Sequence, residues 1–225
     1  MSREAKRLRG EMVSISNSSD PYPNLEAEMA LTRRCLEILS TSDCRIQIIT
    51  KSSLVARDAD LLKERKSMVA LTITTDDDDV AGTIEPHAPP PSERLKAAEK
   101  LIENGLPTVV RIDPIIPYVN DNPERLVKTL ASLGVRHITV STYKVRLDNW
   151  RRFSAAMPQT ASRLRPLYFE KGERIAGCLC LPRDLRLRLM ENVRALAEEN
   201  GVRFGTCREG LGHLNTAVCD GSWLL

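Results

Sequence analysis

The feature that most constrains the fold of this sequence is an alternation of short apolar runs with longer amphipathic stretches. The apolar runs are Met12–Ser16, Arg45–Thr50, Met68–Thr75, Leu106–Ile112 and Val135–Thr142. Helix-like stretches separate them, near residues 24–39, 57–66, 92–104 and 123–133. Strict alternation of strands and helices predicts βαβ units and a parallel sheet. The runs are apolar on both faces, as is typical of strands buried between helices.

After residue 143 the alternation becomes less regular. Two further helices are predicted, Leu147–Met157 and Leu181–Asn200, together with a short strand, Val202–Thr206. The segment between these helices gives no clear pattern, and residues 75–91 are expected to form a long loop. We therefore expect a barrel-like part over residues 1–143. Residues 144–225 are expected to be an extension packed on the same domain.

Composition limits the partners and the compartment that the chain requires. The 225 residues are 42% hydrophobic, which is enough for one substantial core. Lys and Arg number 33 against 30 Asp and Glu, so charge demands neither a nucleic-acid nor a membrane partner. No apolar run is long enough to span a bilayer. Six unevenly spaced cysteines and a charged start predict a reduced, cytoplasmic protein.

Polar residues follow the predicted strands, where parallel sheets place their ligands. Ser19 and Asp20 come after the first strand and Lys51 after the second, while Thr72 lies on the third. Hydroxyls and a carboxylate can bind a zwitterion or a ribose, and a lysine can pair with a carboxylate. The alternatives are ordinary helix-capping residues, a surface lysine and a threonine chosen for strand propensity.

The order of these motifs resembles one family. The motifs are Ser-Asp-Pro-Tyr at 19–22, Thr-Lys-Ser at 50–52, Thr-Ile-Thr-Thr at 72–75, Glu-Pro at 85–86 and Pro-Ile-Ile-Pro at 114–117. They occur in this order in the radical S-adenosylmethionine (SAM) proteins related to spore photoproduct lyase. The resemblance covers residues 12–141, and the tail with Cys207 and Cys219 is similar to an archaeal-type branch of that group.

The resemblance implies an α/β fold, a partial (β/α)6 TIM-type barrel. It implies S-adenosyl-L-methionine and a 4Fe–4S cluster as cofactors, and a radical reaction on an unknown substrate. Ser19, Asp20, Lys51 and Thr72 match the cofactor-binding positions, and Lys51 would pair with the cofactor carboxylate. Nucleic acid is a possible substrate class by family alone.

The sequence departs from the family pattern in two places. The CxxxCxxC motif that binds the cluster is absent. The first barrel strand and the cluster loop are expected to precede Met1, with residues 2–10 ending the first helix, which makes this chain an inactive, truncated form. Spore photoproduct lyases also carry a hydrogen-donor cysteine just before the Ser-Asp turn. Asn17 occupies that position here, so photoproduct repair by that route is not expected.

Other interpretations remain open. The four cysteines 178, 180, 207 and 219 are candidates for an auxiliary metal site, and Cys207 and Cys219, in a glycine-rich tail, are the better candidates. The alternative is that all four are ordinary thiols. The chain is alternatively a non-catalytic barrel binding protein that lost its cluster. A third interpretation is a conventional barrel enzyme that uses Lys51 as a Schiff-base lysine.

Overall fold

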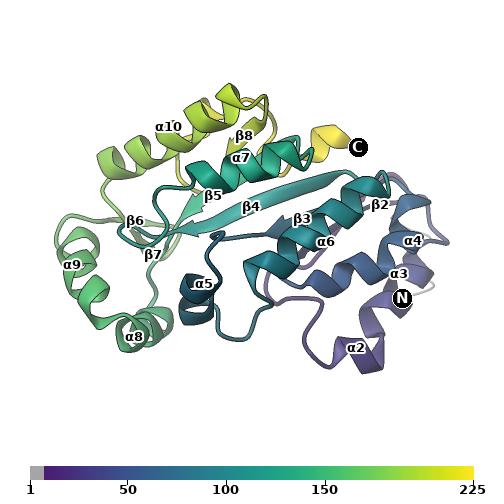
Figure 1. Ribbon diagram of the computed structural model, residues 1–225, viewed down its shortest axis with the longest axis horizontal. Coiled ribbons are helices and arrows are strands. Elements are labelled where there is room, and N and C mark those ends of the chain that lie inside the picture. The colour runs from purple at the N-terminus through teal and green to yellow at the C-terminus, as the bar shows by residue number, and fades with distance from the viewer. Residues whose placement is uncertain (1–7) are drawn as a thin grey trace.

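The computed structural model describes residues 8–225 and is built around a parallel sheet with the strand order β1-β2-β3-β4-β5-β8 (Figure 1). These strands are β1 Met12–Ile15, β2 Arg45–Thr50, β3 Ser67–Thr72, β4 Thr108–Ile115, β5 His137–Thr142 and β8 Arg203–Thr206. Each predicted strand is present, which confirms the α/β partial barrel. Residues 2–7 of the predicted helical segment 2–10 lie outside the described residues. Residues 8–10 form a turn before β1 and not the end of a helix, so that part of the prediction is wrong.

Helices cover the convex side of the sheet and extend from its end. They are α2 Glu26–Met29, α3 Leu31–Leu39, α4 Ala59–Lys63, α5 Asp78–Ile84, α6 Pro91–Glu103, α7 Glu124–Ser132, α8 Leu147–Ala156, α9 Pro158–Phe169 and α10 Arg183–Glu199. Short 3-10 helices are η1 Ser53–Asp58, η2 Gly212–Leu214 and η3 Ser222–Leu224, and β6 Glu173–Ile175 pairs with β7 Cys178–Cys180 in a hairpin. None of the helices within residues 8–225 combines the length and apolarity needed to cross a bilayer.

Two local predictions are wrong. The expected loop at 75–91 contains α5, because the Asp77 carboxylate caps it by accepting the backbone N–H groups of Asp79 and Val80. The run of aspartates therefore starts a helix, where negative charge is favourable. The expected helix at 24–39 is divided into α2 and α3 at Ala30, whose φ of 48° is left-handed.

The main core lies between the sheet and the helices. Ile48, Leu71, Ile112 and Val140 are completely buried on four successive strands, and α3, α4, α6, α7 and α10 pack over them. The last strand, β8, pairs in parallel with β5, so the sheet continues into the segment after residue 143. Helix α10 packs against β8, β5 and α7.

The C-terminal tail lies on the opposite, concave face of the sheet. The carbonyl of Cys219 accepts the Thr139 hydroxyl at 2.6 Å, and the carbonyl of Asp220 accepts the Gln47 amide at 3.1 Å. The close approach requires glycine at 205, because a Cβ there would lie 2.7 Å from the Cys219 Cα. The tail therefore covers the part of this face near the amino ends of the strands.

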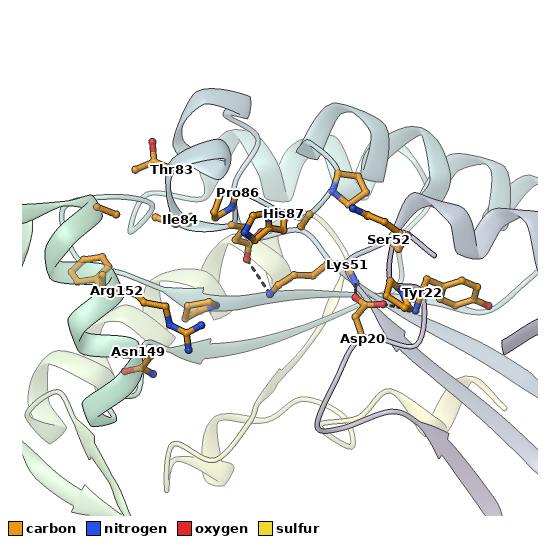
Figure 2. A pocket seen from close by; sticks show the side chains of 18 of the residues that line it. Asp20, Tyr22, Lys51, Ser52, Thr83, Ile84, Pro86, His87, Asn149 and Arg152 are labelled. Atoms are coloured by element: carbon orange, nitrogen blue, oxygen red, sulfur yellow. Dashed lines mark hydrogen bonds and ion pairs between the residues drawn. The ribbon is translucent and has the colours of Figure 1, made fainter. Parts of the chain in front are cut away.

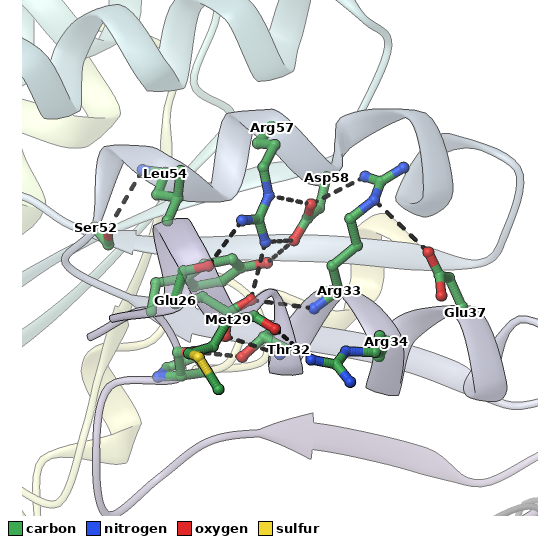
Figure 3. Close-up of polar contacts among 12 residues, drawn as sticks. Glu26, Met29, Thr32, Arg33, Arg34, Glu37, Ser52, Leu54, Arg57 and Asp58 are labelled. Carbon is green, nitrogen blue, oxygen red and sulfur yellow. Dashed lines mark hydrogen bonds and ion pairs between the residues drawn. The ribbon is translucent and has the colours of Figure 1, made fainter. Parts of the chain in front are cut away.

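A buried ionic cluster fixes the first helical segment against the chain that follows β2 (Figure 3). The fully buried Asp58 carboxylate accepts hydrogen bonds from Tyr22 at 3.1 Å, from Arg33 at 3.0 Å and from Arg57 at 2.8 Å. Arg57 also bonds the Glu26 carboxylate at 2.9 Å. Burial and the Asp58 charge raise the pKa of Tyr22, so its hydroxyl stays protonated and donates.

We expect Asp58→Asn to lower the free energy of unfolding by about 3 kcal/mol, because it leaves two guanidinium groups and a phenol around a neutral side chain. Urea denaturation measures the loss. Asp60→Asn is the matched control, since Asp60 also binds Arg33 but is about half exposed. It is expected to cost less than about 1 kcal/mol. Equal losses for the two variants would contradict the role given to burial.

Candidate functional site

A cavity of about 830 Å³ opens at the carboxyl edge of the sheet (Figure 2). Its walls come from the loops after β1, β2, β3, β4 and β5 and from one face of α8. Because parallel strands end at this edge together, residues far apart in the sequence meet there. Asp20 and Lys51, two of the four predicted cofactor residues, line this cavity.

Asp20 joins the ends of two neighbouring strands. Its carboxylate accepts the Thr50 hydroxyl at 2.6 Å, the Lys51 backbone N–H at 2.7 Å and the Tyr22 N–H at 2.9 Å. Three of the roughly four acceptor positions of a carboxylate are thereby used. Asp20 therefore sets the shape of the loop and the position of Lys51.

Lys51 forms an ion pair with Glu85 at the cavity wall, and Figure 2 marks it by the dashed line that starts at the Lys51 side chain. The Lys51 Nζ lies 3.0 Å from Glu85 Oε1, and the lysine side chain is one-third exposed. Glu85 is nearly buried and also accepts the Thr74 hydroxyl at 2.7 Å and Arg94 at 2.7 Å. Burial alone would raise the pKa of Glu85, but Lys51 and Arg94 hold it below its usual value. Glu85 is therefore a fixed anion beneath a partly exposed cation.

Arg94 anchors this wall from behind. It is fully buried and donates to the carbonyls of Pro89 and Thr72 as well as to Glu85. The ion pair between Glu85 and Lys51 thus rests on α6 and on the end of β3. A rigid second layer of this kind holds a binding group in position.

The far wall holds residues that sequence reasoning missed, namely Tyr143, Arg152 and Phe153. Tyr143 packs on Phe153 with ring centroids 5.2 Å apart, and its buried hydroxyl has no hydrogen-bond partner among the described residues. Burial raises the pKa of Tyr143 to about 12, so the group is a donor at neutral pH. Its position directly after β5 was the signal that could have identified it.

The other two predicted cofactor residues lie apart from Asp20 and Lys51. Ser19 is exposed on the turn before Asp20, where its carbonyl accepts the Ser16 hydroxyl. Thr72 is buried at the end of β3, on the concave face that also carries Met68 and Ala70. Neither lines the cavity, and their role in cofactor binding stays a prediction.

Cys207 and Cys219 lie near Arg111 on the concave face. The Arg111 guanidinium donates to the Asp113 carboxylate at 2.6 Å, and burial, followed by the charge of Cys207, raises the pKa of Cys219. Cys178 and Cys180 lie instead on β7. Within residues 8–225, no three His, Cys, Asp or Glu side chains gather in a way that could hold a metal ion. The described residues thus bring no third ligand to Cys207 and Cys219.

Comparison with proteins of known structure shows the same fold. A spore photoproduct lyase variant, solved with AdoMet and a dinucleoside spore photoproduct, superposes with a TM-score of 0.67 at 19% identity. The match covers 87% of this chain and 61% of that one. The resemblance found in the strand-end motifs is therefore confirmed at the level of fold.

Sequence comparison gives the family. An uncharacterized protein of the Acidianus two-tailed virus is 37% identical over 141 residues, which cover 59% of this chain and 46% of that protein. An uncharacterized protein of Methanocaldococcus jannaschii is 37% identical over 117 residues, 52% of this chain and 44% of that one. The chain thus spans about half the length of these curated relatives. Residues 1–130 match the family model of the radical SAM superfamily, and the chain belongs to that superfamily.

Proposed function

We propose that the cavity at the carboxyl edge holds S-adenosyl-L-methionine, and that the whole protein is a radical SAM enzyme. The observation that carries the proposal is the convergence of Asp20, Lys51 and Glu85 in one cavity of a chain from this superfamily. When bound to a reduced 4Fe–4S cluster, SAM supplies a carbon radical that abstracts hydrogen from a substrate. The residues of this chain bind and orient the ligands for that chemistry.

The cavity suits the charges of the cofactor. Lys51 carries three N–H donors, and its ion pair with Glu85 uses one of them. A ligand carboxylate can therefore bind Lys51 while Glu85 keeps the ammonium in place. Asp20 fixes the backbone from which Lys51 projects, so the loop is organised before the ligand arrives.

The cluster does not fit the residues that the structure describes. The sequence has no CxxxCxxC, and residues 8–225 gather no metal-binding group of three ligands. We propose that the thiolates for a 4Fe–4S cluster come from a segment outside these 225 residues. On this view the present chain binds the organic cofactor but starts no radical reaction.

The substrate would enter against the far wall. Tyr143 offers an unused donor there, Phe153 an aromatic surface and Arg152 a positive charge. A nucleic-acid substrate is supported only by the fold that the chain shares with a spore photoproduct lyase bound to a dinucleoside. A non-catalytic barrel that binds a ligand at the same place remains the second candidate, because the chain lacks the cluster motif.

We expect Lys51→Gln to weaken SAM binding to this chain about tenfold or more, because one charge-assisted hydrogen bond to a carboxylate is worth about 1.5–3 kcal/mol. Isothermal titration calorimetry with SAM measures the change without any need for the cluster. Lys96→Gln on α6 is the matched control, since Lys96 is exposed and does not line the cavity.

The proposal for the cavity fails if SAM binds wild type and Lys51→Gln with equal affinity. Methionine and 5′-deoxyadenosine extend the test. Lys51→Gln should weaken the binding of methionine, which carries the carboxylate. It should leave the binding of 5′-deoxyadenosine unchanged, because that ligand has no carboxylate.

Anaerobic reconstitution with iron and sulfide is expected to leave this 225-residue chain without a 4Fe–4S cluster. Iron content should stay far below four atoms per chain, and dithionite should produce no 5′-deoxyadenosine from SAM. Iron analysis, electron paramagnetic resonance and chromatography of the products test this. Cleavage of SAM by this chain alone would refute the assignment of the cluster to another segment.

A further inference from the structure

A second cavity of about 370 Å³ lies on the other side of α8, between α8, α9 and the β6–β7 hairpin. Figure 1 shows these elements grouped at the end of the molecule remote from α2 and α3. We propose that this cavity binds a nucleoside phosphate, with the base against aromatic side chains and the phosphate among arginines. The inference needs neither SAM nor a cluster, and it is independent of the function proposed above.

Three arginines from three different elements converge on this cavity. Arg146 precedes α8, Arg165 lies on α9 and Arg174 lies on β6. None of the three forms an ion pair within residues 8–225, and no acidic residue of that range lines the cavity. Three guanidinium groups around one hollow repel each other, and a bound anion removes that repulsion.

Two of the three acidic side chains of residues 144–174 bind arginines away from this cavity, and the third, Glu170, is exposed and does not line it. Asp148 binds Arg152 at 2.9 Å on an exposed face of α8, and Glu173 binds the buried Arg186 at 2.6 Å. Residues 144–174 contain eight Lys and Arg against three Asp and Glu, whereas the whole chain has 33 against 30. The segment that forms most of this cavity is therefore more positively charged than the chain as a whole.

Two of the arginines contact partners other than carboxylates. The Arg146 Nε donates to the Cys178 Sγ at 3.2 Å, so its terminal nitrogens remain available. The Arg165 guanidinium lies 5.3 Å from the centre of the Phe169 ring. A guanidinium fixed by a thiol or a ring keeps its charge for a ligand, and its fork geometry matches phosphate.

Aromatic rings form the apolar wall of the cavity. Trp150 and Phe169 meet edge to face with centroids 5.2 Å apart, and Phe169 is 44% exposed. Aromatic rings beside arginines offer a stacking surface for a flat base and charge for its phosphate. An aliphatic anion would contact only the arginines. The presence of both arginines and aromatic rings therefore favours a nucleoside phosphate as the ligand.

Trp150 provides a direct readout. The chain has two tryptophans, so Trp223→Phe leaves Trp150 as the single emitter. In that background, AMP is expected to quench the fluorescence saturably. Ribose 5-phosphate and adenosine, which each keep one half of the ligand, are expected to bind at least tenfold more weakly. Raised salt should weaken AMP binding, as expected for phosphate contacts.

Substitutions separate a built site from general positive charge. Arg174→Gln and Arg165→Gln are each expected to lower the affinity for AMP about tenfold. Arg151→Gln is the matched control, because Arg151 is an exposed arginine of α8 that does not line the cavity. It should leave the affinity unchanged. Circular dichroism confirms that each variant is folded before titration.

Three outcomes would overturn the proposal. They are the absence of saturable quenching at millimolar AMP, an equal loss for all three arginine variants, and equal binding of AMP and ribose 5-phosphate. Titration with a dinucleotide distinguishes a mononucleotide ligand from a segment of nucleic acid. Much tighter, Arg174-dependent binding of the dinucleotide than of AMP would overturn the assignment to a mononucleotide.

Discussion

A parallel sheet leaves backbone groups at the carboxyl ends of its strands without strand partners, and in this chain side chains from distant loops satisfy them. Asp20 accepts the N–H of Lys51 beyond β2. The buried Glu209 accepts the N–H of Thr142 at the end of β5 at 2.7 Å. Asn120 accepts the N–H of Ile116 and donates to the carbonyl of Thr74. These bonds hold together the strand-end loops at the edge of the sheet where the main cavity opens.

The strands of this fold could be predicted from the sequence because each is a continuous apolar run bounded by polar or glycine residues. The missed elements lack such a pattern. Helix α5 lies within an acidic, proline-flanked segment and depends on a cap by Asp77. Helix α9 contains Pro166, and the hairpin after it is stabilised by pairing of three residues on each side. These features depend on contacts that a one-dimensional pattern does not contain.

The candidate site was predictable to the extent that it lies at strand ends. Asp20 and Lys51 directly follow strands, and the rule for parallel sheets brings them together. The use to which each is put was not predictable. The Asp20 carboxylate forms its hydrogen bonds within the strand-end loops, and Lys51 forms an ion pair with Glu85, which comes from a different loop. Helix α8 could be recognised from its periodicity. Its position between two cavities could not be predicted, and there Phe153 lines one cavity while Trp150 lines the other.

The C-terminal tail covers the concave face of the sheet at the end remote from the main cavity. Gly205 and Gly221 allow residues 219–221 to lie against the sheet, and Leu224 and Leu225 pack on Met68, Ala70 and Val109. These tail residues therefore close the concave face near the amino ends of the strands, and none of them lines the cavity at the carboxyl edge. A bulkier side chain at position 205 would displace the segment around Cys219 from the sheet and open this face without touching any residue that lines the cavity.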